Sequence, residues 1–226
     1  ATTYSSTPLT LGAQPFTYED VAVALRELLL PWDAQPQEAW PAAAGNTARL
    51  VLSFNAACSG VNAVDGSQKS GTGAAGDLIQ TVSSIGRAVT ASSTRSQYYT
   101  GINAGSEYTI VCLCDYYVGG SIQQLVASDS QTDSARALQF RIDSLFRPEL
   151  IVFNTSTTAF FATGATSVPV DGSPFVVAGR VRGTELTVWL NGVQVGSATL
   201  TGTVRTLTGK LIHIANDGRA NSSPYT

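Results

Sequence analysis

The sequence is poor in charged side chains. Lys, Arg, Asp and Glu together make up 13% of the 226 residues, and the formal net charge is only −3. Arg180 and Arg182 alternate with apolar residues, as on the solvent face of a strand, and no longer run of Lys and Arg occurs. Because proteins bind nucleic acids through clustered positive charge, we expect no DNA or RNA partner.

Long apolar runs are also absent, since no stretch of 18 or more apolar residues occurs. We therefore expect no membrane-spanning helix. The opening segment ATTYSSTPLT has neither the charged start nor the apolar stretch of a signal peptide. The chain contains no Met and begins with Ala, which fits removal of an initiator Met and fits a cleaved signal peptide equally well. These features leave the compartment open.

Cysteine and histidine are scarce, with three Cys and one His. Cys112 and Cys114 lie two residues apart, on one face of a predicted strand, and Cys58 is distant in the sequence. Neither the spacing nor the number of ligands matches a zinc site, and an odd count disfavours a disulfide framework. We expect reduced thiols that pack as small apolar groups. His213, in KLIHIA, is expected to be a strand residue rather than a ligand or a catalytic base.

The first 46 residues contain the one clear helical pattern. The segment FTYEDVAVALRELLLPWD has the apolar spacing of an amphipathic helix, which we predict over about residues 18–30. Thr17 is a suitable N-cap, and Pro31 ends the helix. The apolar stripe consists of Val21, Leu25, Leu28 and Leu29, and Phe16 occupies the staple position before it.

A linker with regularly spaced prolines follows the helix and carries Trp32 and Trp40. A short amphipathic helix is marginal in water by itself, so its stripe must pack on another surface. That surface is either the rest of this chain or another subunit. We predict that residues 1–46 form an arm that docks through Phe16, Val21, Leu25, Leu28, Leu29, Trp32 and Trp40.

Residues 47–226 have an almost purely β pattern. Short predicted strands are separated by Gly, Ser, Asn, Asp and Pro, and no second helical pattern interrupts them. This spacing favours an antiparallel two-sheet sandwich of the jelly-roll type. Segment 57–78 is rich in Gly and Ser and is predicted to be a long surface loop. The predicted strands are 48–54, 96–102, 107–117, 121–128, 137–143, 149–153, 159–162, 174–181, 185–190, 193–200 and 209–215.

The segment TVWLNGVQVG (187–196) predicts a hairpin. Asn191 and Gly192 both tolerate positive φ, as a two-residue type I′ turn requires. Such a turn pairs Leu190 with Val193, Val188 with Val195, Leu186 with Ser197, Trp189 with Gln194, and Thr187 with Gly196. We expect one face to point into the core, formed by Leu186, Val188, Leu190, Val193 and Val195.

Trp189 points to the opposite face of this hairpin, beside Gln194. Three explanations stay open for this residue. A loop of its own domain covers it, or the N-terminal helix or a neighbouring subunit covers it, or its ring is an open surface on which a sugar stacks.

Several segments occur in a familiar order: GRAVTASSTRSQYYTG (86–101), SEYTIVCLCDYYVGG (106–120), ALQFRI, ELTVWLNGVQVGSAT and KLIHIANDG (210–218). In this order they resemble the laminin G-like, concanavalin A-like jelly-roll superfamily, over about residues 48–226. The resemblance implies a further last strand after the final segment, where this chain stops at NSSPYT. The domain at 47–226 is therefore expected to lack that strand, or to receive it from residues or a chain beyond the sequence.

The resemblance also implies particular chemistry. Glycosidases of this superfamily carry closely spaced acids on one strand, whereas none of the six Glu here has an acid two residues away. We therefore expect no enzymatic activity and no cofactor. Laminin G-like domains often bind calcium before the strand that corresponds to ALQFRI. Asp129 and Asp133 are weak calcium candidates at that place, and Arg136 beside them opposes a cation.

Jelly-roll domains with a short anchoring segment resemble capsid-decorating, fibre and tail proteins of tailed phages. By this analogy we predict a non-catalytic virion component on the virion surface, joined to other virion subunits or to itself through the arm. Its sandwich is expected to bind host glycans, with Trp189 and Gln194 as glycan or interface contacts. The alternative is a secreted or cell-surface carbohydrate-binding module, which would be extracellular.

Overall fold

The computed structural model describes residues 70–72, 79–83, 86–90, 97–100, 102, 104–115, 122–128 and 136–215. Every regular element within these ranges is a β-strand, and no helix in this part of the chain is long and apolar enough to cross a membrane. Several predictions fall outside the described residues. They are the helix at 18–30 and the arm contacts Phe16, Val21, Leu25, Leu28, Leu29, Trp32 and Trp40, the strand at 48–54, Cys58, the calcium candidates Asp129 and Asp133, and the NSSPYT end.

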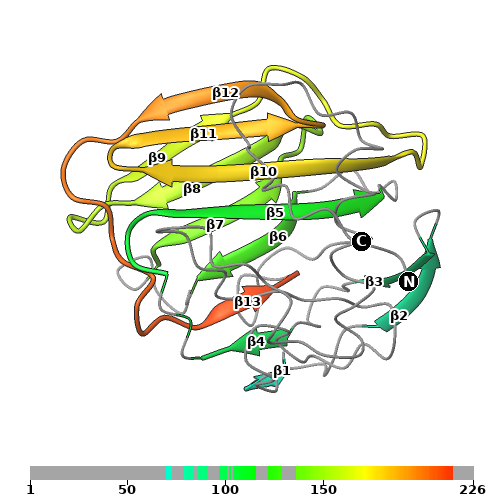
Figure 1. The fold of residues 1–226 in the computed structure, drawn as a ribbon, viewed down its shortest axis with the longest axis horizontal. Coiled ribbons are helices and arrows are strands. Elements are labelled where there is room, and N and C mark those ends of the chain that lie inside the picture. Colours follow the sequence, from blue (N-terminus) through cyan, green and yellow to red (C-terminus); the bar gives the residue numbers. More distant parts are fainter. Residues whose placement is uncertain are drawn as a thin grey trace, which may run out of the picture.

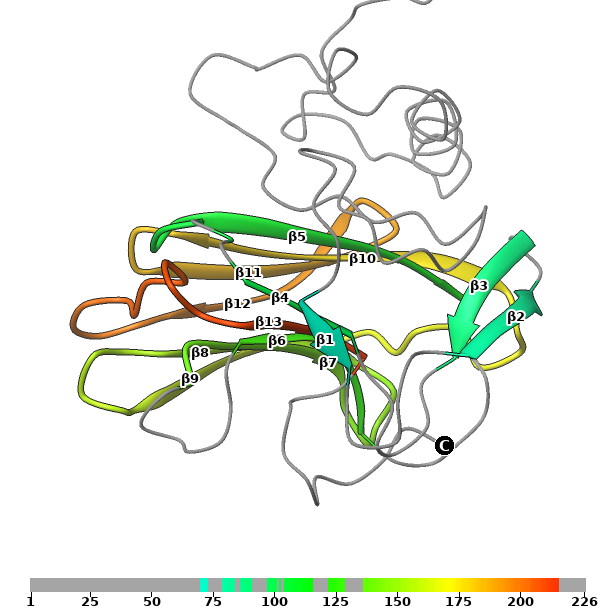
Figure 2. The same cartoon turned by 90° about the horizontal axis from the view of Figure 1, so that it is seen from below.

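Two antiparallel sheets lie face to face, which confirms the predicted jelly-roll sandwich (Figures 1 and 2). One sheet has the strand order β1-β4-β13-β6-β7-β8-β9 and the other the order β12-β11-β10-β5. A separate hairpin, β2-β3, lies at one end of the sandwich. The strands are β1 Gly71–Thr72, β2 Ile79–Ser83, β3 Gly86–Thr90, β4 Gln97–Tyr99, β5 Tyr108–Asp115, β6 Gln123–Ser128, β7 Leu138–Ile142, β8 Pro148–Phe153, β9 Ala159–Thr163, β10 Pro174–Arg182, β11 Glu185–Leu190, β12 Val193–Thr199 and β13 Ile212–Ile214.

The core lies between the two sheets and is built from alternate residues of each strand. Phe140 and Leu150 of the seven-stranded sheet and Val177 and Val188 of the four-stranded sheet are completely buried. Gly179 lies in the middle of β10, where a Cβ atom would be 3.1 Å from the Phe140 ring. The small residue therefore lets this ring reach the opposite sheet.

The sequence pattern predicts every described strand from β4 onward but misses the first three. The prediction of a loop over segment 57–78 is wrong at β1, where Gly71 and Thr72 pair with β4. A strand of two residues has no periodicity to detect, and Gly71 fits there because its missing Cβ leaves room for the Tyr98 hydroxyl. Strands β2 and β3 escape prediction because their Ser, Thr and Gly residues hide the alternation.

The turn between β11 and β12 has the predicted conformation. Asn191 has a φ of 49° and Gly192 a φ of 79°, as a type I′ turn requires. The turn also packs on β10: the backbone N–H of Val176 donates to Asn191 Oδ1 at 2.8 Å, and the N–H of Asn191 donates to the carbonyl of Val176 at 2.8 Å. The predicted pairs of Leu190 with Val193 and of Trp189 with Gln194 are present.

Beyond these two pairs the predicted register is wrong. A β-bulge inserts Val195 as an extra residue, so that Val188 pairs with Gly196. Two contacts with β9 and the following loop explain the bulge. The N–H of Ala165 donates to the Val195 carbonyl at 2.9 Å, and Gly196 lies so close to Thr163 that a Cβ atom would be 2.3 Å from its carbonyl oxygen. Strand β12 therefore bends toward β9 and closes this side of the sandwich.

The bulge also changes which residues face the core. Leu186 pairs with Ala198 rather than Ser197, and Thr187 pairs with Ser197 rather than Gly196. Leu186, Val188 and Leu190 are buried as predicted, and Val195 packs partly against the core. Val193 does not face the core, because 53% of its surface is exposed at the tip of the hairpin.

Cys112 and Cys114 lie on the same face of β5, as predicted, and pack against the core. Burial raises the pKa of the Cys112 thiol to about 12. His213 is a strand residue of β13, as predicted, and its ring centroid lies 5.4 Å from that of Tyr98. These side chains therefore belong to the packing of the sandwich.

Candidate functional site

The outer face of the four-stranded sheet carries a row of residues, one from each strand. Val111 of β5 pairs with Ala178 of β10, Ala178 pairs with Trp189 of β11, and Trp189 pairs with Gln194 of β12. Val111 is 41% exposed, Gln194 is exposed and Trp189 is half-buried. We call this row, together with Arg180, Arg182, Glu185 and Thr187 on the same face, the Trp189 face.

Arg180 lies over the ring of Trp189. Its guanidinium carbon is 5.0 Å from the centroid of the indole, which is the geometry of a cation–π contact. Arg180 Nη2 is also 3.8 Å from Glu185 Oε2, beyond hydrogen-bond distance, and the Glu185 side chain is 54% exposed. The stack on the ring therefore orients Arg180 more firmly than the loose ion pair does.

Two polar atoms of the Trp189 face are buried without a hydrogen-bond partner. They are Nε of Arg180 and Oγ1 of Thr187, and the two residues are directly opposite each other in the β10–β11 register. Thr187 has no exposed surface although it lies on the outer face. Because buried polar groups are normally hydrogen-bonded, these two atoms retain unused hydrogen-bonding capacity beside Trp189.

The sequence predicts that Trp189 and Gln194 are neighbours on this face, and it does not predict Arg180 beside them. The structure brings Trp189 and Gln194 side by side and adds Arg180 from the neighbouring strand. The alternation around Arg180 indicates only a solvent face. A further signal lies in the two-residue connection Gly183-Thr184, which fixes the β10–β11 register and places Arg180 and Trp189 on one face. The Arg180 stack also answers part of the question about Trp189, since a side chain of its own domain covers one face of the ring.

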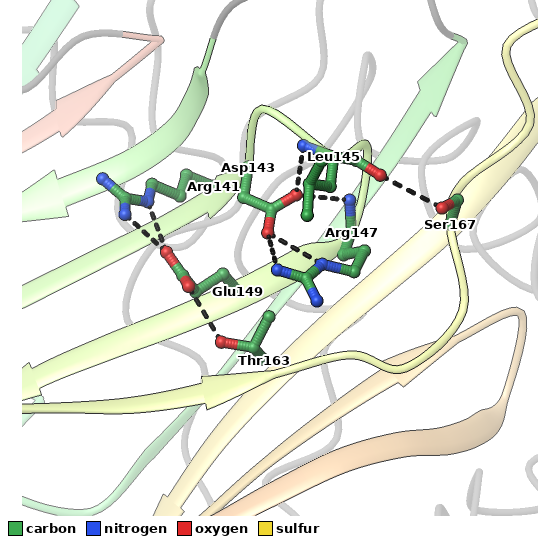
Figure 3. A network of polar contacts seen from close by, with 7 residues as sticks. All are labelled: Arg141, Asp143, Leu145, Arg147, Glu149, Thr163 and Ser167. Atoms are coloured by element: carbon green, nitrogen blue, oxygen red, sulfur yellow. Dashed lines mark hydrogen bonds and ion pairs between the residues drawn. The ribbon is translucent and has the colours of Figure 1, made fainter.

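A second polar cluster lies around the turn between β7 and β8 (Figure 3). Asp143 accepts hydrogen bonds from the backbone N–H groups of Leu145 and Arg147, both at 2.9 Å, and from the Arg147 guanidinium at 2.7 and 2.9 Å. Burial by itself would raise the pKa of Asp143, but these hydrogen bonds and the charge of Arg147 outweigh it and lower the pKa. Asp143 is therefore ionised and stabilises the turn through these hydrogen bonds.

The carboxylate of Glu149, in the same cluster, also has hydrogen-bond partners on both of its oxygens. It accepts from Arg141 Nε at 2.7 Å and from the Thr163 hydroxyl at 2.8 Å, and these contacts connect β7, β8 and β9 (Figure 3). Among the described residues, no group of three His, Cys, Asp or Glu side chains is arranged to hold a metal ion. The polar cluster thus stabilises the sheet, whereas the Trp189 face retains exposed and unpaired groups, and we take the Trp189 face as the candidate site.

Comparisons with known proteins bear on the fold. No protein-family profile matches the sequence, and no curated protein matches it. Among solved structures, the sandwich is similar to the enzymatically active domain of tailspike protein 2 of bacteriophage CBA120, with a TM-score of 0.50 and 12% identity over 71% of this chain. The similarity concerns the fold of the matched parts alone. The matched part is only 28% of the tailspike chain.

Two further similar structures were determined with a bound oligosaccharide. One is the CBM40 module of an IT-sialidase from Ruminococcus gnavus bound to α2,3-sialyllactose, with a TM-score of 0.49 and 14% identity over 66% of this chain and 82% of that chain. The other is domain 4 of AbnA, a GH43 extracellular arabinanase from Geobacillus stearothermophilus, in complex with arabinotriose, with a TM-score of 0.49 and 13% identity over 67% of this chain and 71% of that chain.

Proposed function

We propose that this chain is a non-catalytic binding module whose Trp189 face binds a glycan. The supporting observation is the half-buried indole of Trp189 between two side chains that can hydrogen-bond, Arg180 and Gln194. A pyranose ring has an apolar C–H face that packs on an indole and a rim of hydroxyl groups that needs donors and acceptors. The exposed part of the Trp189 ring supplies the first, and Arg180 and Gln194 supply the second.

A glycan array tests this proposal. The wild-type chain is expected to bind a defined set of glycans, Trp189→Ala to lose them, and Trp189→Phe to retain part of the binding because an aromatic ring remains. Phe161→Ala is the matched control, since Phe161 is an aromatic residue of β9 that is 51% exposed on the seven-stranded sheet. An array without hits for the wild type, or equal binding by wild type and Trp189→Ala, would reject the Trp189 face as the glycan site.

We further propose that the module is carried on a virion by the arm at residues 1–46. The support is the amphipathic stripe predicted from the sequence, together with the fold shared with a phage tailspike domain. This step is an analogy at the level of the fold. A Leu25→Asp change in the full chain should leave the sandwich folded but prevent its incorporation into particles, because it places a charge on the docking stripe.

The alternative proposal is a secreted or cell-surface carbohydrate-binding module that acts outside any particle. It predicts the same array result and no effect of Leu25→Asp on delivery. Gly105→Ala serves as the control for a general loss of yield, because it strains one turn of the sandwich, where Gly105 has a φ of 69°, without touching the stripe. Incorporation of Leu25→Asp at the wild-type level would reject the anchoring role of the stripe.

A further inference from the structure

Arg180 has more hydrogen-bonding capacity than its partners use. A guanidinium has five N–H donors in one plane. Within the described residues, its Nε is buried without a partner, and its one charged neighbour, Glu185, lies at 3.8 Å. A carboxylate that pairs properly with Arg forms two parallel hydrogen bonds at about 2.7–2.9 Å. Glu185 therefore does not satisfy Arg180.

The ring of Trp189 holds the guanidinium plane in place. At 5.0 Å from the indole centroid, Arg180 is oriented by the stack before any ligand arrives. An oriented guanidinium loses less conformational freedom when it pairs with a ligand than a mobile Lys or Arg does. The side chain is also accessible, with 30% of its surface exposed.

Charge and polarity on the Trp189 face favour an anionic group at this place. Two cations, Arg180 and Arg182, face one anion, Glu185, which lies opposite Arg182 in the register. The residue opposite Arg180 in the register, Thr187, is uncharged and completely buried. These groups lie next to the ring on which a sugar would pack.

We propose that the ligand is an acidic saccharide whose carboxylate pairs with Arg180 while its ring packs against Trp189. This inference rests on the proposed glycan-binding function. The carboxylate displaces the loose contact of Glu185 and forms a two-pronged pair with the Arg180 guanidinium. Glu185 then acts as the internal competitor for this site, so that removal of its charge strengthens binding of the acidic ligand.

Calorimetric titration with trigalacturonic acid and with its methyl ester tests the proposal. The two probes share their ring and hydroxyl groups and differ in charge. We expect the wild-type chain to bind the acid at least tenfold more tightly than the ester. Arg180→Lys keeps the charge but not the planar fork and should lose most of this preference. Glu185→Gln should bind the acid more tightly than the wild type, with the ester unchanged.

The outcomes separate this inference from the proposed function. Equal affinity for acid and ester, or a full preference in Arg180→Lys, would overturn the acidic-ligand proposal. If neutral glycans nevertheless bind on the array in a Trp189-dependent manner, the proposed function stands without it. If Arg180→Lys lowers the affinity for acid and ester alike, Arg180 acts by holding the Trp189 ring in position, and the proposed pair between Arg180 and the ligand carboxylate is refuted.

Discussion

The close approach of β12 and β9 predicts that Gly196→Ala is strongly destabilising. A Cβ atom at position 196 would lie 2.3 Å from the carbonyl oxygen of Thr163, where ordinary contact begins at 3.4 Å. The two strands must therefore separate by roughly 1 Å, which breaks the 2.9 Å hydrogen bond from Ala165 to Val195. Overpacking costs about 1–3 kcal/mol and the lost hydrogen bond about 1 kcal/mol, so we expect a loss of about 2–4 kcal/mol.

Urea unfolding followed by circular dichroism measures this loss. Gly172→Ala is the matched control, because Gly172 has a φ of 82° but open space around its Cβ position. Its cost is the backbone strain alone, about 1 kcal/mol. The φ of Gly196 is not positive, so the cost of Gly196→Ala is purely steric. A Gly196→Ala variant that loses less stability than Gly172→Ala would refute the close approach of β12 to Thr163.

Three further predictions concern Asp143, Asn191 and Cys112. Asp143→Asn should weaken folding by about 2 kcal/mol at pH 7. Folding lowers the pKa of Asp143 below its usual 3.8, so this stabilisation is present above that value and is lost as the pH falls through the folded-state pKa. The difference in urea midpoint between wild type and Asp143→Asn should therefore be smaller at pH 3 than at pH 7. An equal difference at both pH values would contradict the stabilising role of the ionised carboxylate. Asn191→Ala should lower the free energy of unfolding by about 2 kcal/mol, measured by thermal unfolding, because it removes both a residue that tolerates positive φ and the hydrogen bond from the Val176 N–H. Asn191→Gly removes only the hydrogen bond and should cost about half as much. Equal losses in the two variants would contradict this account. Cys112 should resist iodoacetamide at pH 8 until the chain unfolds, as followed by peptide mass spectrometry, because burial raises its pKa to about 12; rapid labelling of the folded protein would show that the thiol is accessible.

The sequence predicts features of the fold that depend on local patterns. Alternation gives the strands from β4 onward, and the Asn191-Gly192 pair gives the turn because both residues accept positive φ. The bulge at Val195 is not local. It depends on hydrogen bonding with Ala165 and close contact with Thr163, both about thirty residues earlier in the chain. No pattern within the hairpin carries that information.

One part of the candidate site can likewise be predicted from the sequence, and another part cannot. Trp189 and Gln194 lie at the turn, so the hairpin register alone is enough to predict that they are adjacent. The Arg180 stack also follows from a register, but its significance depends on side-chain geometry, namely a ring contact at 5.0 Å and a buried Nε without a partner. Strand alternation places Arg180 on a face, whereas the contact of its guanidinium with the indole depends on the rotamers that both side chains adopt.

Fluorescence of a single-tryptophan variant tests the glycan-binding claim most directly. The chain has three Trp, so Trp32→Phe combined with Trp40→Phe leaves Trp189 as the one reporter. The variant is titrated with the oligosaccharide that binds best on the array, and acrylamide quenching is measured with and without it. We predict a saturable change in Trp189 emission and reduced quenching at saturation, because the sugar ring covers the exposed part of the indole. Saturable binding by calorimetry with unchanged Trp189 emission and quenching would contradict the assignment of the Trp189 face.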